Sequence, residues 1–215
     1  MFIWLASYPK SGNTLVRSLL ASYFFSKDGI YNFSLSKNIK QFPTLKLFED
    51  LGIDITNEKE VIANYIRVQQ SFNKKESTQF LKTHSYLFNI ENNAFTDLNN
   101  SLGVIYIVRD PRNIVTSYAS HNSLSVKEAA KNLISNMRAG GDLSHFNPTS
   151  RTTVYVGTWG SHYKSWQSFK SQGKYLLIKY EDLINKKEEV LLKMLKFIYK
   201  LNKKIFEIDK VKLKN

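Results

Sequence analysis

Residues 8–14 read Y-P-K-S-G-N-T and stand between an apolar run and a helical pattern. A strand, a tight loop and a helix start in this order direct backbone N–H groups and the positive end of a helix dipole to one place, where an anion binds well. Lys10 adds a mobile positive charge, and Gly12 allows a close backbone approach. Asn13 and Thr14 add small polar side chains. The segment predicts a phosphate or phosphosulfate site, with a polar turn that caps a core helix as the alternative.

A second candidate anion site follows the β-branched run at residues 104–108, which is typical of a strand buried on both faces. An Asp-Pro pair ends this run, and a helix is expected to begin near Asn113. Arg109 stands at the strand end and Ser117 one turn into the helix, so a guanidinium and a hydroxyl can converge on one anion. The alternative is a local ion pair between Arg109 and Asp110, with Ser117 facing solvent.

The third candidate is a short strand at residues 79–84, which ends in lysine, threonine and histidine. Lys82 and His84 are two positions apart on an extended chain, so their side chains point the same way. A histidine titrates near neutrality, and His84 could therefore accept a proton during a reaction. The alternative is a structural histidine, which is the usual role of a lone one.

Together these segments resemble, in content and in order, the sulfotransferases that use 3′-phosphoadenosine 5′-phosphosulfate (PAPS). The family's phosphosulfate loop reads Y-P-K-S-G-[TN]-T, its catalytic base ends a lysine-threonine-histidine strand, and its R-x7-S element holds the 3′-phosphate; this sequence contains all three. Residues 157–166 look like the family's G-S-W-x-x-H-x-x-x-W helix, and residues 176–183 look like its strand ending in Y-E-D-L. The resemblance extends from residue 2 to about residue 200.

The resemblance implies a role for each matched residue. Backbone amides from Ser11 to Thr14, with Lys10 and the Thr14 hydroxyl, would hold the 5′-phosphosulfate. Arg109 and Ser117 would hold the 3′-phosphate, and Tyr180 would contact the adenine end. The donor-binding residues implied in this way are Lys10, Ser11, Gly12, Asn13, Thr14, Arg109, Ser117 and Tyr180.

The implied reaction moves a sulfonyl group from PAPS to an acceptor hydroxyl or amine by in-line displacement, without a metal. His84 would be the general base, Lys10 would neutralise charge on the leaving phosphate oxygen, and Lys82 would do so on the sulfonyl oxygens. The acceptor could be a small molecule, a glycan or a lipid headgroup, and the sequence specifies neither it nor an oligomeric state.

Two departures from the family pattern leave other functions open. Members typically continue beyond a region like residues 203–215 into an R-K-G segment that closes on the 3′-phosphate, and this sequence lacks it. Leu15 stands where many members have tryptophan. Because each lost charge-assisted contact is worth roughly 1.5–3 kcal/mol, weakened donor affinity is expected. The alternatives are a truncated, weak or inactive relative that binds nucleotide, and a nucleotide kinase-like or nucleic-acid-binding protein.

The elements that must position these residues follow from the apolar pattern. Strands are expected near residues 2–7, 79–83, 103–108 and 175–179, each feeding a helix or loop. This order predicts an α/β fold: one domain over residues 1–215, with a central parallel β-sheet flanked by helices, which the resemblance makes a P-loop-kinase-like sulfotransferase fold. Ligands bind at the carboxyl ends of such strands. We therefore expect Lys10, Lys82, His84, Arg109 and Tyr180 to meet at one edge.

The composition agrees with this interpretation without proving it. The 215 residues include 31 Lys+Arg against 18 Asp+Glu, which gives a net charge of +13. This charge favours polyanionic partners, although nucleic acid is not a required partner. The alternative is a solvated basic surface. The absence of cysteine excludes disulfides and thiolate catalysis, and the four histidines lack metal-ligand spacing. No apolar run approaches the roughly 20 residues of a membrane span, and none fits a signal peptide. A cytoplasmic protein is expected.

Other segments receive only structural interpretations. Trp159, Tyr163 and Trp166 recur at helical spacing and are interpreted as a core-facing stripe, and neither they nor His162 is assigned chemistry. Residues 187–199 predict an amphipathic packing helix. Residues 123–148 could form a mobile lid over the acceptor or a simple connection.

Overall fold

A five-stranded parallel sheet forms the centre of the molecule. The computed structural model describes residues 1–139 and 153–214. The strand order is β2 (Lys40–Gln41), β3 (Gln79–Thr83), β1 (Phe2–Ser7), β6 (Ser101–Val108) and β9 (Tyr175–Lys179). All neighbouring strands run parallel. This confirms the predicted α/β fold and the four predicted strands, and it adds the short edge strand β2.

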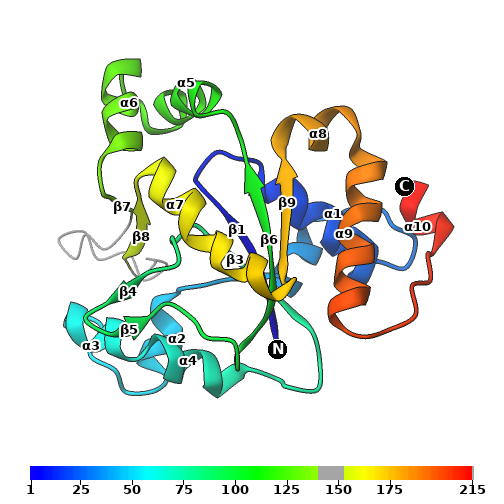
Figure 1. The fold of residues 1–215 in the computed structure, drawn as a ribbon, viewed down its shortest axis with the longest axis horizontal. Coiled ribbons are helices and arrows are strands. Elements are labelled where there is room, and N and C mark those ends of the chain that lie inside the picture. The colour runs from blue at the N-terminus through cyan, green and yellow to red at the C-terminus, as the bar shows by residue number, and fades with distance from the viewer. Residues whose placement is uncertain (140–152, 215) are drawn as a thin grey trace.

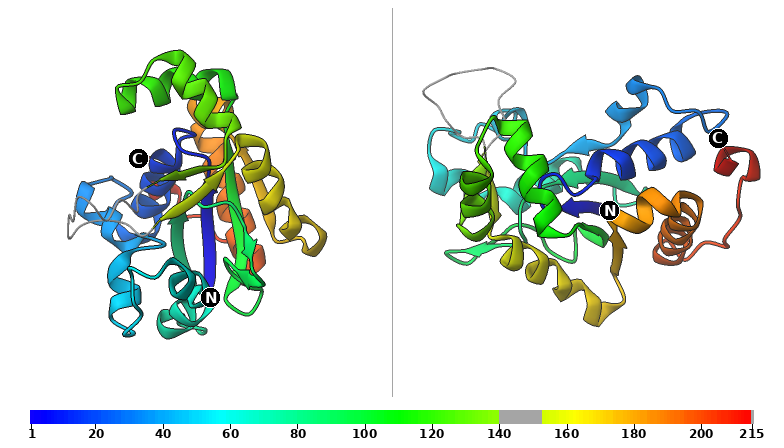
Figure 2. Two further views of the ribbon diagram at one scale, coloured as in Figure 1. Left: turned by 90° about the vertical axis from the view of Figure 1, so that its left-hand side faces the viewer. Right: turned by 90° about the horizontal axis from the view of Figure 1, so that it is seen from above.

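Helices cover both faces of this sheet (Figures 1 and 2). One face packs against α1 (Asn13–Phe25), α8 (Tyr180–Asn185) and α9 (Lys187–Leu201), with η1 (Phe33–Asn38) and α10 (Lys210–Lys214) beside them. The opposite face packs against α2 (Leu45–Glu49), α3 (Glu58–Ala63), α4 (Tyr65–Phe72), α7 (Trp159–Ser165) and η2 (Trp166–Gln172). The carboxyl edge between these layers is left to loops and to two further helices, α5 (Pro111–Asn122) and α6 (Val126–Ile134).

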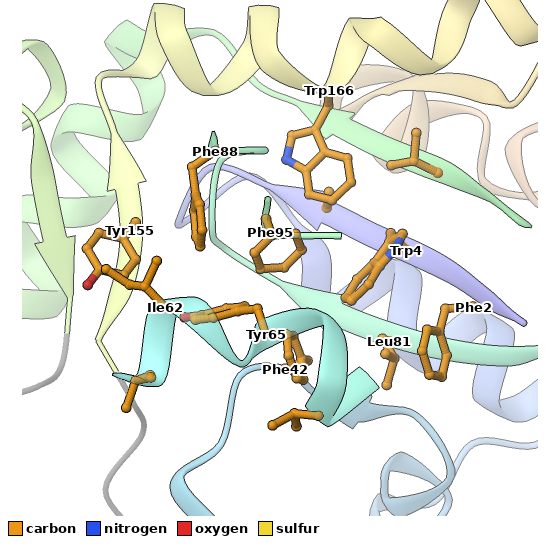
Figure 3. Packing of buried hydrophobic residues seen from close by; sticks show 14 of the residues in the cluster. Phe2, Trp4, Phe42, Ile62, Tyr65, Leu81, Phe88, Phe95, Tyr155 and Trp166 are labelled. Atoms are coloured by element: carbon orange, nitrogen blue, oxygen red, sulfur yellow. The ribbon is translucent and has the colours of Figure 1, made fainter. Parts of the chain in front are cut away.

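Strand β1 lies in the middle of the sheet and all six of its residues are buried. Its alternate side chains therefore reach two separate hydrophobic clusters. Trp4 faces the α4 and η2 side, where its ring centroid lies 5.1 Å from that of Phe95 and 6.1 Å from that of Trp166 (Figure 3). Leu5 faces the α1 and α9 side. Packing on both faces holds β1 rigid up to the loop that follows it.

Several local predictions can be checked against the described residues. Helix α9 buries Val190, Leu191, Met194, Leu195 and Ile198, which confirms the predicted packing helix. Helix α5 begins at Pro111, before the expected Asn113, because Asp110 caps it by accepting the backbone N–H of Arg112 at 2.8 Å.

Two small antiparallel pairs complete the secondary structure: β4 (Asn89–Ile90) with β5 (Asn93–Ala94), and β7 (Met137–Ala139) with β8 (Val154–Gly157). The proposed lid at residues 123–148 contains α6 and β7, and its residues 140–148 lie outside the described residues. Among the described residues, no helix is long and apolar enough to cross a membrane.

Candidate active site

The loop after β1, which we name the anion loop (residues 8–12), turns sharply into α1. Lys10 has a φ of 67° and Gly12 a φ of 94°, both in the left-handed region. Gly12 is the N-cap of α1, and no side chain of the described residues caps this helix start. The first backbone N–H groups of α1 therefore lack a side-chain acceptor, which is the arrangement that an anion can complete.

The anion loop needs glycine at position 12 for two reasons. The positive φ disfavours any residue with a Cβ. In addition, a Cβ at Gly12 would lie 2.6 Å from Cδ2 of Tyr180, the first residue of α8. Tyr180 thus packs directly on the loop, and it ties the end of β9 to the end of β1.

Arg109 joins the same group from the end of β6. Its Nη1 donates to the backbone oxygen of Lys10 at 2.9 Å, and its guanidinium carbon lies 4.3 Å from the ring centroid of Tyr180. Asp110 pairs instead with Arg112, at 2.5 Å, so the alternative of an Arg109–Asp110 ion pair is not found. Hydrogen bonds from Arg112 lower the pKa of Asp110 to about 2. The structure therefore brings Lys10, Arg109 and Tyr180 together as expected.

Ser11 Oγ and Arg109 Nε are among the buried polar atoms that make no hydrogen bond with any described residue. Buried polar groups are nearly always paired in proteins, so unpaired ones call for a partner. A hydroxyl and a guanidinium N–H next to an uncapped helix start and Lys10 are donors of the kind that bind phosphate and sulfate oxygens. The residues present therefore fit the anionic groups of PAPS.

The remaining donor-binding candidates behave differently from one another. The side-chain amide of Asn13 donates to Leu5 O at 2.8 Å and to Ser7 Oγ at 3.1 Å, so it anchors α1 to β1. These two contacts engage the Asn13 side chain within the protein, and a role of Asn13 in anion binding, including that of its backbone amide, stays a prediction. Thr14 is exposed at the helix start.

Ser117 is partly buried in α5. Within the described residues no hydrogen bond joins Ser117 to Arg109. Their convergence on one phosphate therefore stays a prediction.

His84 directly follows β3 and reaches across to β1. Its Nδ1 lies 2.8 Å from Ser7 O, the last carbonyl before the anion loop. A carbonyl oxygen only accepts, so we assign the ring proton to Nδ1. Nε2 then carries the lone pair, which is the form a general base requires. The structure thus places the imidazole of His84 against the end of β1, the strand that leads into the anion loop.

Lys82 lies within β3, directly opposite Leu5 of β1. It shares its face of β3 with Phe80, which packs in the cluster beneath α1. Lys82 is therefore on the side of the sheet from which the anion loop and α1 rise.

His162 on α7 contacts the backbone of His84, which the sequence pattern did not predict. It is fully buried; its Nε2 lies 3.1 Å from His84 O and its Nδ1 lies 2.8 Å from the hydroxyl of Tyr106. The signal that could have found it is a polar side chain inside an otherwise apolar helical stripe. Such a residue needs buried partners, but the pattern alone does not say which.

Comparison with known proteins gives the family. The chain matches the sulfotransferase domain over residues 2–210. It is 26% identical over 215 residues to luciferin sulfotransferase of Photinus pyralis, and this alignment covers 95% of this chain and 52% of that protein. It is 24% identical over 205 residues to sulfotransferase 1 family member D1 of Mus musculus, covering 92% of this chain and 59% of that protein. The chain therefore spans just over half the length of these curated relatives.

Solved structures share the fold. A mouse sulfotransferase complexed with PAP superposes with a TM-score of 0.56 at 17% identity, covering 99% of this chain and 61% of the other. Retinol dehydratase in a complex with retinol and PAP gives a TM-score of 0.57 at 16% identity, covering 98% of this chain and 62% of the other. The family match over residues 2–210, with this shared architecture, shows that the chain belongs to the sulfotransferase family.

Proposed function

We propose that this chain transfers a sulfonyl group from PAPS to an acceptor hydroxyl or amine, with His84 as the general base. The observation that carries the proposal is the 2.8 Å contact between His84 Nδ1 and Ser7 O. It joins the strand end that bears the base to the strand that opens the anion loop. The two chemical tasks, holding an anionic donor and accepting a proton, thus fall to neighbouring strand ends.

The donor would be held by groups with complementary charge and hydrogen-bonding capacity. Lys10, the backbone amides from Ser11 to Thr14 and the Thr14 hydroxyl would bind the 5′-phosphosulfate. Arg109, with an unpaired Nε, would bind the 3′-phosphate together with Ser117. When bound, PAPS supplies an activated sulfonyl group with a phosphate as its leaving group.

His84 is suited to receive a proton at Nε2. As that nitrogen becomes protonated, the ring gains a positive charge, and the hydrogen bond from Nδ1–H to Ser7 O strengthens. The carbonyl also keeps the ring from rotating, so the acceptor meets the same nitrogen in every encounter. Lys82, on the α1 side of β3, would neutralise negative charge that develops on the transferred group.

The acceptor class is proposed more broadly. The relatives include a protein named for luciferin and a structure that contains retinol. Luciferin and retinol are both small organic molecules. A small molecule with a hydroxyl or amine is therefore the first acceptor class to test, ahead of glycans and lipid headgroups.

The test is an acceptor screen with radiolabelled PAPS. Panels of phenols, alcohols, amines and sugars are incubated with the wild type, with His84→Ala and with Lys10→Ala, while calorimetry measures binding of 3′-phosphoadenosine 5′-phosphate (PAP). We expect transfer by the wild type, loss of at least about 100-fold in His84→Ala with PAP binding retained, and weaker PAP binding in Lys10→Ala. His121→Ala, at an exposed histidine near the end of α5, is the matched control and keeps wild-type activity.

Two outcomes would contradict the proposal. Wild-type protein that binds PAP but labels no acceptor would be a nucleotide-binding relative without transferase activity. Wild-type protein that does not bind PAP would lack the donor site altogether.

A further inference from the structure

The chain from His84 to Phe88, which we name the base loop (residues 84–88), forms neither helix nor strand. It nevertheless carries the proposed base, and each of its residues is buried or half-buried. An irregular segment has no ladder of backbone hydrogen bonds, so its N–H and C=O groups need other partners. The identity of those partners determines how firmly His84 is held.

Helix α7 and the first residue of η2 supply three of these partners through side chains. His162 Nε2 lies 3.1 Å from His84 O, and the indole Nε1 of Trp166 donates to Ser85 O at 3.0 Å. The third is the backbone N–H of Leu87, which donates to a serine hydroxyl at 2.9 Å. The three side chains are three and four positions apart and so share one helix face: His162, Ser165 and Trp166.

His162 is fixed in a single protonation state by its surroundings. Burial lowers its pKa to about 3, so the ring is neutral near pH 7. Its Nε2 faces a carbonyl and must carry the proton, and its Nδ1 then accepts the hydroxyl of Tyr106 at 2.8 Å. Burial also raises the pKa of Tyr106, which keeps that hydroxyl protonated. The ring therefore acts as a permanent donor to the base loop.

His84 is consequently held at two points. Its carbonyl is held from α7, on one face of the sheet, and its ring is held by Ser7 of β1. Fixing both the backbone and the ring leaves little rotational freedom at this residue, which is what an oriented base requires.

We infer that His162 is a positioning residue for sulfonyl transfer. Together with Ser165 and Trp166, it fixes the backbone of the base loop, and this backbone places the His84 ring where Ser7 O of β1 can orient it. This inference rests on the proposed function, since it concerns the base of that reaction. A histidine that only completes the core would affect stability and leave the orientation of His84 unchanged.

The experiment compares His162→Phe, which keeps an aromatic ring but has no donor, with His162→Gln, whose amide can still donate to His84 O. We expect kcat to fall about 100-fold in His162→Phe with PAP affinity unchanged, and most of the rate to return in His162→Gln. The matched control is Gln69→Leu. Gln69 is also buried and donates to a backbone carbonyl, that of Phe95 at 2.5 Å, but it lies on α4. This control is expected to lower stability with kcat unchanged.

A second readout does not depend on activity. In protein with isotope-labelled histidine, long-range nitrogen–proton spectra report which ring nitrogen of His84 is protonated, with His84→Ala providing the assignment. We expect the Nδ1–H form in the wild type and a mixture of both forms in His162→Phe. Folded His162→Phe with an unchanged His84 spectrum would overturn the inference. If this variant does not fold, His162→Leu, which also lacks a donor, takes its place, and the same unchanged spectrum would overturn the inference.

The two readouts separate failure of the inference from failure of the proposed function. A wild type that transfers no label counts against the proposed function, while the His84 spectra still decide whether α7 holds the base loop. An active wild type with equal kcat in all folded variants counts against the inference alone.

Discussion

The anion loop and the base loop lie next to each other at the carboxyl edge of the sheet, yet they are built in opposite ways. Beside the anion loop, Ser11 Oγ and Arg109 Nε are buried and make no hydrogen bond with any described residue, and no side chain among those residues caps α1. In the base loop, the backbone groups of His84, Ser85 and Leu87 each receive a side-chain partner from α7 or η2.

The difference follows from the two tasks. An anion site must keep donors unpaired until its ligand arrives, and each unpaired buried group destabilises the protein by roughly 1–3 kcal/mol. A base has the opposite need, because its orientation depends on neighbours that are already satisfied. Ser85 Oγ, which is buried and makes no hydrogen bond with the described residues, shows that the base loop is satisfied in its backbone and not in every side chain.

The largest expected effect separates the two loops by function. His84→Ala should lower kcat by about 10²- to 10⁴-fold, because the proton acceptor is lost. PAP affinity should stay at the wild-type value, because the anion loop is intact. Steady-state kinetics and calorimetry on one preparation measure both. A parallel loss of PAP affinity would show that the two loops do not act separately.

Gly12→Ala should break the anion loop and leave the base loop in place. The new Cβ would meet Tyr180 at 2.6 Å while φ stays at 94°, so both strain and a displaced ring are expected. Backbone strain alone destabilises by about 1–2 kcal/mol, and the shift of Tyr180 adds to it and weakens PAP binding. Urea denaturation and calorimetry measure the two effects.

Gly52→Ala isolates the backbone term in this comparison. Gly52 has a φ of 70° and no atom of the described residues within 4 Å of an added Cβ. The Gly52→Ala variant should be destabilised only by backbone strain, and its PAP affinity should equal that of the wild type. Equal destabilisation by both substitutions would mean that Tyr180 does not press on the loop.

Arg109→Lys tests whether the donor side depends on geometry or only on charge. Lysine keeps the charge but loses the planar fork that reaches Lys10 O and stacks on Tyr180. Losing a charge-assisted contact of roughly 1.5–3 kcal/mol should weaken PAP binding about 10- to 100-fold, with kcat at saturating donor preserved. Arg112→Lys is the control, since Arg112 is 89% exposed and pairs only with Asp110 among the described residues. Similar PAP affinities in both variants would refute a specific role of the Arg109 fork.

The sequence allowed the sheet to be predicted because β1 and β6 are almost continuously apolar, and the anion loop because its glycine and lysine stand directly after such a strand. The positions of Lys10, His84, Arg109 and Tyr180 at one edge follow from the parallel order of the strands. Local pattern could not reveal where the Asn13 amide points, since its partners, Leu5 O and Ser7 Oγ, belong to the preceding strand and are fixed by tertiary packing. Nor could it reveal His162, whose partner His84 is 78 positions away in the chain.

The last prediction concerns acid stability, and it distinguishes the base loop from the anion loop once more. An unfolded histidine titrates near pH 6.5, whereas burial lowers the pKa of His162 to about 3 in the folded protein. Between these values the unfolded chain binds a proton that the folded chain does not, so the free energy of unfolding falls as the pH falls. The slope from this residue is at most about 1.4 kcal/mol per pH unit, and the contribution is fully present above pH 6.5.

His162→Gln should therefore give a shallower dependence of unfolding free energy on pH between about 6.5 and 3, in urea denaturation at stepped pH values. Carboxylates contribute equally to both proteins, so the difference in slope belongs to the buried ring. The exposed His121, replaced in the same way, should leave the slope unchanged. Identical slopes in the wild type and His162→Gln would mean that the ring is not held neutral, and the base loop would then lack the permanent donor that sets it apart from the anion loop.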